Sequence, residues 1–386
     1  MSATIQPFQI AVPQAELDDL GERIARTRWP DCETVGDTSQ GPRLAKIRAL
    51  CDHWQNGYDW RKCEALLNGL GQFRTEIDGL DIHFLHIRSP EADAMPLILS
   101  HGWPGSVLEF RDVIGQLTDP GAHGGDPRQA FDLVIPSLPG FGFSGKPTQT
   151  GWGLARIADA WITLMARLGY ARWGAQGGDW GAAVTTMIGH KAPAGCAGIH
   201  LNFVMYQPTS DEIAAATPEE QAMLASARRY DQLLSGYAKM QGTRPQTIGY
   251  SLADSPVGLA AWIYAMFQDV SDSDGDAESV FSKDAILDDI MMYWLTNSGA
   301  SSARLYWEAM SSMAGGGAAP DPMHIPTAIS MFPKEQVRLS RRWAECRFNN
   351  LVHFNELQAG GHFAAMEQPI TFVNELRLGF SQMRLA

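Results

Sequence analysis

The sequence predicts an α/β fold, in which a largely parallel sheet is flanked by helices and interrupted by a helical insertion. Short apolar runs such as "MPLILSHGWPG" and "FDLVIPSLPG" indicate buried strands. The amphipathic segment "GLARIADAWITLMARLGY" lies between strand-like runs, an order typical of parallel sheets. Residues 206–320 break this rhythm with mostly helical patterning that is rich in methionine and aromatic residues.

Bulk composition limits the class of protein. A chain of 386 residues fits one large core with an insertion, or two domains, and 45% hydrophobic with 19% charged residues is typical of a globular protein. The net charge of −13, without a run of lysine or arginine, argues against nucleic acid and anionic membranes as partners. Five scattered cysteines without a C-x-x-C motif favour a reducing cytoplasm over a disulfide framework or a zinc ribbon.

Residues 1–95 are expected to form an N-terminal helical meander and the first strands of the sheet. The segment "PQAELDDLGERIARTRW" has helical apolar spacing and an acidic first turn, and helices and loops are expected as far as residue 72. The next segment, "FRTEIDGLDIHFLHI", alternates around Asp78-Gly79 and predicts a hairpin. The N-terminus has neither a positive start nor a long apolar stretch, so no signal peptide or membrane anchor is expected.

The remainder divides into three predicted parts. Residues 96–205 form the first part of the core, with the strands "ARWGAQGG" and "CAGIHLNF" following the amphipathic helix. Residues 206–320 form a helical cap, because an insertion between sheet segments typically covers a site, and its end is the Gly/Ala/Pro-rich "AGGGAAPDP". Residues 321–386 complete the core with the strands "PTAISMF" and "NNLVHFNEL" and the helix "QPITFVNELRLGFSQM".

The stretch "GAQGGDWGAAV" places Asp179 between glycines, after an apolar segment and before a helix of small residues. This context is typical of the nucleophile elbow of α/β-hydrolases, which usually carries serine in the pattern G-x-S-x-G. The alternative is an ordinary glycine-rich turn whose aspartate caps the next helix. Two further motifs favour the elbow.

The first motif, "LILSHGWPGS", ends a predicted strand. In α/β-hydrolases the loop at this point and the residue after the nucleophile supply the two backbone N–H groups of an oxyanion hole. Trp103 and Trp180 occupy these places.

The second motif, "QAGGHFAAMEQP", follows the last predicted strand and contains His362, at the place of the histidine base in this chain order. An acid must orient that histidine. Glu335 stands just beyond the strand "PTAISMF" and is the preferred candidate. Glu345, Glu356 and Glu367 are its rivals; Glu356 is expected within the last strand and Glu345 in the helix-like stretch before it.

An aspartate nucleophile indicates attack on saturated carbon. A serine would leave an ether there, which is a dead end, whereas a carboxylate leaves an ester that water can cleave. An aspartate carboxyl, with a reference pKa of ~3.9, needs no base to ionise at neutral pH, which leaves His362 free to activate water. Halide departs unaided, but an epoxide oxygen needs a proton donor, and seven of the nine tyrosines lie between Tyr206 and Tyr306 in the expected cap.

One further glycine motif is set aside. The segment "GFGFSGKP", residues 140–147, fits both G-x-G-x-x-G and G-x-x-x-x-G-K. Pro147 stands where a phosphate loop needs serine or threonine, and Asp159 lies within a helix rather than at a strand end. A tight loop after a strand and near the site is the preferred interpretation, so no cofactor and no metal are expected.

The chain resembles the microsomal type of epoxide hydrolase, which belongs to the α/β-hydrolase superfamily. "PFQIAVPQAELDDLGERIARTRWPD", "HGWPGS", "LPGFGFSGKP", "GGDWG", "DSPVGLAAWI", "FPKE" and "GGHFAAMEQP" carry the likeness. The resemblance implies Asp179 as nucleophile, Glu335 as charge-relay acid and His362 as base. It also implies that Tyr237 in "LSGYAKMQ" and Tyr306 in "ARLYWEAM" polarise the epoxide oxygen.

The resemblance also implies the partners. They are a small apolar epoxide and water, and a homo-oligomer is possible. The mammalian microsomal members begin with a membrane anchor, whereas this chain starts directly at the meander, so a soluble, cytoplasmic enzyme like the bacterial relatives is expected. The alternatives are a haloalkane dehalogenase that uses the same aspartate, a non-catalytic binding protein on this scaffold, and an ester or amide hydrolase.

Overall fold

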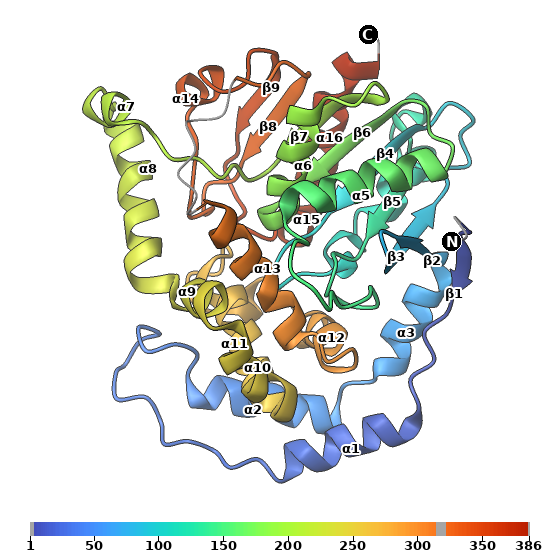
Figure 1. Ribbon diagram of the computed structural model, residues 1–386. Helices are drawn as coiled ribbons and strands as arrows, with labels where there is room; N and C mark the ends of the chain where they lie inside the picture. The colour runs from blue at the N-terminus through green and yellow to red at the C-terminus, as the bar shows by residue number, and fades with distance from the viewer. Residues whose placement is uncertain (1–3, 314–321, 385–386) are drawn as a thin grey trace.

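The computed structural model describes residues 4–313 and 322–384 and is built around one sheet (Figure 1). Within those residues the strand order is β1-β2-β3-β5-β4-β6-β7-β8-β9. Pairing is antiparallel from β1 to β5 and parallel from β5 to β9. The strands are β1 Gln6–Phe8, β2 Gln72–Ile77, β3 Leu80–Ile87, β4 Met95–Ser100, β5 Phe131–Pro136, β6 Trp173–Gly177, β7 Cys196–Leu201, β8 Thr327–Met331 and β9 Leu351–Glu356.

The first strand corrects the sequence analysis. Residues 1–72 were expected to form helices and loops, but Gln6–Phe8 pairs with β2 as the edge of the sheet. Pro7 lacks a backbone N–H, which restricts it to an edge strand, and three residues are too few to show an alternating pattern. The expected hairpin is confirmed, since β2 and β3 join through Asp78 and Gly79 with φ values of 52° and 78°.

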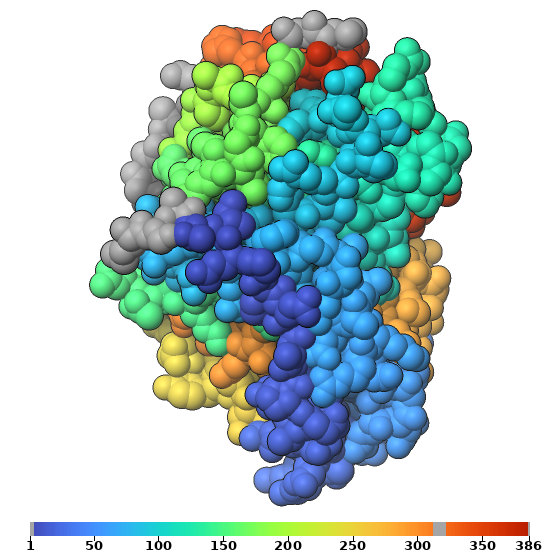
Figure 2. Space-filling model, turned by 90° about the vertical axis from the view of Figure 1, so that its right-hand side faces the viewer, coloured from blue at the N-terminus to red at the C-terminus, as the bar shows by residue number. Residues whose placement is uncertain are grey.

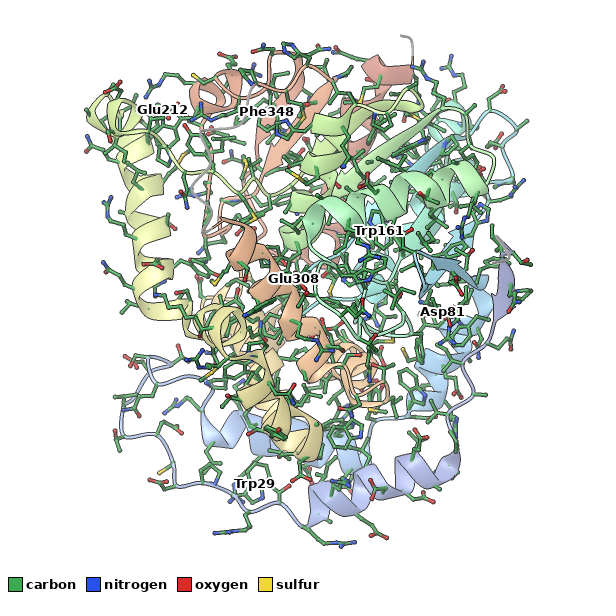
Figure 3. All side chains as sticks on the ribbon, in the orientation of Figure 1. Trp29, Asp81, Trp161, Glu212, Glu308 and Phe348 are labelled. Atoms are coloured by element: carbon green, nitrogen blue, oxygen red, sulfur yellow. The ribbon has the colours of Figure 1, made fainter. Side chains whose placement is uncertain are left out.

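Helices cover both faces of the parallel strands. α5 and α6 lie on one face of the sheet and α16 lies on the other. Strand β7 contacts both α6 and α16, since its alternate side chains point to opposite faces of the sheet. Trp161 of α5 points into the core (Figure 3), where its Nε1–H donates to Ser100 Oγ at 3.0 Å. The helices of the core are α4 Ile114–Thr118, α5 Leu154–Arg167, α6 Asp179–Lys191, α14 Arg341–Glu345, α15 Ala364–Glu367 and α16 Pro369–Arg384.

In the chain, a group of helices follows β7 and precedes β8, as expected for the cap. The structure confirms the predicted fold class. The four-part division by residue number stays a prediction, and residues 314–321 of the Gly/Ala/Pro-rich end lie outside the described part of the chain. The cap consists of α7 Ser210–Ala214, α8 Pro218–Arg229, the π-helical turn η4 Tyr230–Leu234, α9 Gly236–Thr243, α10 Pro245–Asp254, α11 Pro256–Asp269, the short helical turn η5 Ala277–Ser279, α12 Lys283–Trp294 and α13 Gly299–Met313.

The N-terminal segment packs against the cap. Figure 2 shows it in blue, running along one side of the molecule, and its helices are α1 Gln14–Ala25, α2 Leu44–Asn56 and α3 Trp60–Gly69. Tyr58 donates to Asp288 of α12 at 2.8 Å, and Lys46 of α2 pairs with Asp276 at 2.7 Å. None of the helices in residues 4–313 and 322–384 combines the length and the apolar character needed to cross a membrane.

Asp289 of α12 is a buried carboxyl that should make stability fall with rising pH. It is 2% exposed, and neither of its oxygens has a hydrogen-bond partner among the described residues. Burial, helped by the charge of Asp288, raises the pKa of Asp289 to about 8. Between the ordinary pKa of about 3.9 and pH 8, the folded protein therefore holds a proton that the unfolded chain has lost, so the free energy of unfolding decreases over this window.

Asp289→Asn should remove this dependence and raise the free energy of unfolding at pH 8, at about 1.4 kcal/mol for each pKa unit relieved. Urea denaturation at pH 5 and pH 8 measures the difference. Asp52→Asn, at an exposed position of α2, is the matched control and should leave the pH dependence of the parent unchanged. An equal gain from both substitutions would contradict the assignment.

Candidate active site

Asp179 is the first residue of α6 and follows the end of β6 after a single residue. Its φ of 46° is the strained left-handed conformation that a sharp strand-to-helix turn requires. A Cβ at Gly181 would lie 1.9 Å from the Ser100 carbonyl oxygen, so only glycine lets α6 approach β4 this closely. The glycines of "GGDWG" thus present the carboxylate at the carboxyl end of the sheet.

The loop after β4 faces this carboxylate. The Trp103 backbone N–H donates to Asp179 Oδ1 at 2.8 Å. A Cβ at Gly102 would lie 2.1 Å from the same oxygen, so glycine keeps the space open. Trp180 lies in the first turn of α6, where backbone N–H groups have no intrahelical acceptor. Both tryptophans therefore stand where sequence analysis expects the oxyanion-hole donors.

His362 and Glu335 meet beside Asp179. His362 Nδ1 donates to Glu335 Oε2 at 2.8 Å, and His362 Nε2 lies 3.4 Å from Asp179 Oδ2. Glu335 follows β8 in a turn closed by its own N–H to the Phe332 carbonyl, and it is 2% exposed. The loop of His362 is fixed by its backbone N–H, which donates to Val270 of the cap at 3.0 Å.

The three rival acids lie elsewhere. Glu356 ends β9, and Glu345 ends α14. Glu367 accepts backbone N–H groups of Gly361 and Phe363, each at 2.9 Å, so it holds the loop of His362 and does not contact the imidazole. Among the four candidates, the structure thus brings Glu335 to the histidine.

The charge state of His362 follows from its neighbours. Burial alone would lower its pKa, but the charge of Glu335 and the hydrogen bonds with Asp179 and Glu335 outweigh it and raise the pKa well above the ordinary value. The free site therefore holds an imidazolium between two carboxylates. Loss of the Asp179 charge would remove part of this support and make His362 more acidic.

The two cap tyrosines expected from the resemblance lie over the carboxylate. The ring of Tyr237, on α9, stacks on Trp103 at 4.9 Å, and the ring of Tyr306, on α13, meets Trp180 edge-on at 4.7 Å. Burial raises the pKa of both phenols well above the usual value, so both remain protonated donors. The Tyr306 hydroxyl is buried and has no hydrogen-bond partner among the described residues.

A small cavity of about 40 Å³ opens beside these groups. Its walls include Asp179, His362 and Tyr237 together with apolar side chains of the core and cap. Three of its lining residues also line a groove of about 1090 Å³ between the cap and residues 37–42: Tyr237, Met266 and Gln336. The cavity therefore shares a wall with a wide groove at the surface.

Comparison with known proteins identifies the family. The family model described as "Epoxide hydrolase N terminus" matches residues 5–110, and that described as "alpha/beta hydrolase fold" matches residues 95–256. A protein of Stigmatella aurantiaca, named provisionally as an epoxide hydrolase, is 54% identical over 98% of this chain and 86% of its own length. Epoxide hydrolase 1 of Sus scrofa is 33% identical over 97% of this chain and 88% of its own.

The chain belongs to the epoxide hydrolase family. In agreement, the crystal structure of the juvenile hormone epoxide hydrolase from the silkworm Bombyx mori matches with a TM-score of 0.91 and 28% identity, covering 100% of this chain and 96% of that one. The expected epoxide hydrolase resemblance is confirmed. The roles of the individual site residues stay predictions that rest on the geometry.

Sequence reasoning missed two residues of this epoxide hydrolase site. The Tyr230 hydroxyl, on the π-helical turn η4, lies 2.7 Å from that of Tyr237, and the spacing of seven residues, two helical turns, was the available signal. Glu109 lies in the short helical turn η1 (Val107–Phe110) after "HGWPGS". Burial, followed by the charge of Asp289, raises the pKa of Glu109 to about 8. No motif singled it out.

Proposed function

We propose that the chain hydrolyses an epoxide to a vicinal diol through a covalent ester on Asp179. The observation that carries the proposal is a carboxylate on a nucleophile elbow, with the Trp103 N–H on one oxygen and the His362–Glu335 pair beside the other. An alkyl ester of aspartate can be hydrolysed, whereas an ether of serine cannot. The carboxylate thus suits a substrate that reacts at saturated carbon.

In the first step, a carboxylate oxygen of Asp179 attacks an epoxide carbon, and the carbon–oxygen bond of the ring breaks. The leaving oxygen takes a proton from Tyr237 or Tyr306, whose hydroxyls stay protonated because they are buried. The unpartnered Tyr306 hydroxyl supports this role, since the epoxide oxygen would supply its missing acceptor.

In the second step, the ester is hydrolysed. Formation of the ester neutralises Asp179, and the imidazolium of His362 then gives its proton to the tyrosinate. Neutral His362 takes a proton from water, and the hydroxide attacks the ester carbonyl while the Trp103 and Trp180 N–H groups stabilise the oxyanion. Collapse of the intermediate releases the diol as its alkoxide, which takes the proton back from His362. The new Asp179 carboxyl then gives its own proton to His362, which restores the carboxylate and the imidazolium.

The expected substrate is small and apolar at its reacting end. The cavity of about 40 Å³ accommodates the epoxide ring and little more, so further substituents would extend into the groove. The proposed reaction uses neither a cofactor nor a metal. The cytoplasmic location and the homo-oligomer remain expectations from the sequence.

A single turnover in ¹⁸O-water tests the ester. With enzyme in excess over styrene oxide, the first diol should carry unlabelled oxygen from Asp179, and the label should enter the peptide that contains Asp179. Later turnovers in the same water should yield labelled diol. Label in the first diol, with none in the peptide, would show direct attack by water and reject the covalent mechanism.

A further inference from the structure

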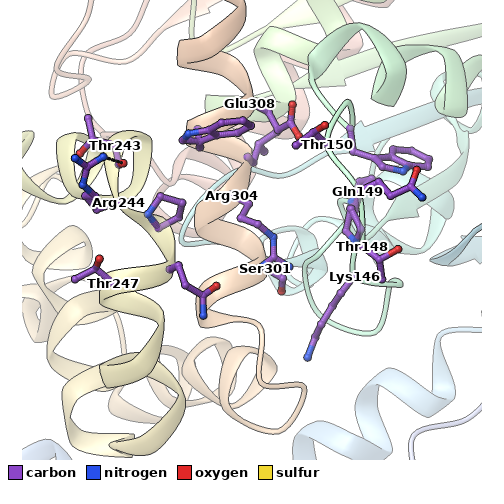
Figure 4. Close-up of a pocket in the computed structure, with 17 residues that line it drawn as sticks. Lys146, Thr148, Gln149, Thr150, Thr243, Arg244, Thr247, Ser301, Arg304 and Glu308 are labelled. Atoms are coloured by element: carbon purple, nitrogen blue, oxygen red, sulfur yellow. Dashed lines mark hydrogen bonds between the residues drawn. The ribbon is translucent and has the colours of Figure 1, made fainter.

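A second hollow lies outside the site, on another side of α13. It is a groove of about 750 Å³, which we call the basic groove (Figure 4). Its walls are α13, the start of α10 and residues 146–152, which follow the tight loop 140–145. The proposed mechanism uses none of the residues that line it. A volume of this size is typical of small-molecule sites.

The charge of the groove is opposite to that of the protein. Arg304, Lys146 and Arg244 line it, and none of them has a carboxylate within 4.0 Å among the described residues. Figure 4 shows Arg304 on α13 between the other two, with Lys146 on the loop and Arg244 at the start of α10. In a chain of net charge −13, three cations around one hollow without paired acids are unusual.

The one acid in the groove serves another purpose. Glu308 stands four residues after Arg304 on α13, the usual spacing for an ion pair, yet its carboxylate accepts the Gly151 N–H at 2.8 Å. It thereby fixes the loop that carries Lys146. Loss of solvent around Lys146, followed by the charge of Arg304, lowers the pKa of Lys146, which indicates that the two cations lie near each other.

The rest of the lining combines apolar side chains with threonine, serine and glutamine. Trp307 is 37% exposed, and the largely buried Trp152 and Leu305 contribute further apolar surface together with Pro139, Pro147 and Pro245. A bare inorganic anion would leave this surface in water, whereas an organic anion would cover it and gain the burial of apolar area. The lining thus fits a ligand with a charged end and an apolar body.

We propose that the basic groove binds a small organic carboxylate with an aromatic or branched apolar body. Arg304 and Lys146 hold the carboxylate, and the tryptophans contact the body. We expect weaker binding of this ligand in the active-site cavity, because Asp179 and Glu335 would repel a carboxylate there. The proposal does not depend on the catalytic mechanism.

Calorimetric titration with 2-naphthoate, at constant ionic strength, tests the site. The neutral isostere 2-naphthamide keeps the apolar rings but lacks the charge, so comparison with it gives the contribution of the charge to binding. Inorganic phosphate is charged but lacks the rings, so comparison with it gives the contribution of the apolar part. We expect saturable binding of naphthoate, with the amide and phosphate each about 10-fold weaker or more. Equal affinity for acid and amide, or no saturable binding of the acid, would overturn the proposal.

Two variants locate the binding. Arg304→Gln and Lys146→Gln should each weaken naphthoate about 10-fold and leave naphthamide unchanged, because only the charged end is affected. Arg128→Gln removes an exposed arginine remote from the groove and should keep the affinity of the parent. If Arg304→Gln does not fold, the affinity of Lys146→Gln for naphthoate alone tests whether the groove is the binding site. Unchanged affinity in the folded variants would reject the groove as the site.

Discussion

His362→Gln is expected to stop turnover after the first chemical step, so that the enzyme accumulates as its ester. The Asp179 carboxylate attacks without a base, but hydrolysis of the ester needs a proton acceptor, which glutamine does not provide. Loss of a general base typically lowers the rate by about 10²- to 10⁴-fold. Intact mass spectrometry after addition of styrene oxide should show one added epoxide, and proteolysis should place it on the peptide of Asp179.

Two controls make this result specific. His123→Gln changes a histidine at an exposed position and should turn over like the parent, with no adduct. Asp179→Ala in the His362→Gln background should abolish the adduct, because the nucleophile is absent. Normal turnover in His362→Gln would remove the histidine from the mechanism, and an adduct on another peptide would reject Asp179 as nucleophile.

The double substitution of Tyr237→Phe and Tyr306→Phe should nearly abolish formation of the ester. The epoxide oxygen then has to leave without a proton donor, and a loss of about 10²- to 10⁴-fold in the rate of that step is expected. Each single variant should retain more activity, because the other phenol can still donate. Stopped-flow tryptophan fluorescence under single-turnover conditions can follow this step, since Trp103 contacts both tyrosine rings and Trp180 contacts that of Tyr306.

Two further tyrosines serve as comparisons. Tyr250→Phe changes a side chain that is 70% exposed and should leave the rate unchanged. Tyr230→Phe should have a smaller effect than Tyr237→Phe, because Tyr230 bonds the hydroxyl of Tyr237 at 2.7 Å and would act through it. A double variant that forms the ester at the parent rate would exclude both phenols as proton donors.

Prediction from sequence worked best where the chemistry depends on neighbouring residues. The elbow needs glycines on both sides of Asp179, since Cβ atoms there would collide with the backbone of β4 and α6. The five consecutive residues of the motif include these glycines, so the requirement can be recognised from the sequence. Strand β4 and the loop after it likewise form one continuous motif. The chain order of Asp179 and His362 added the remaining information.

Prediction was weaker where the partners are far apart in the chain. Four of the five glutamates that follow the cap in sequence were candidates for the acid, and position alone left rivals to Glu335. Which carboxylate reaches the histidine depends on where the end of β8 lies relative to that of β9. Tyr237 and Tyr306 came from the resemblance alone. Strand β1 escaped notice because the strand it pairs with, β2, begins 64 residues after Phe8.

The sequence by itself determined the α/β class, because strands and helices follow from local patterns. It also predicted, from the elbow, the aspartate nucleophile and hence the kind of carbon that it attacks. Only the tertiary structure decided which residues far apart in the chain meet, both at that carboxylate and elsewhere. It brought Tyr230 against Tyr237, placed the partly buried Glu109 near Asp289, and gathered Arg304, Lys146 and Arg244 around one groove outside the site. These contacts join residues of separate elements. They depend on how the whole chain packs to bury its apolar side chains, so a local sequence pattern does not predict them.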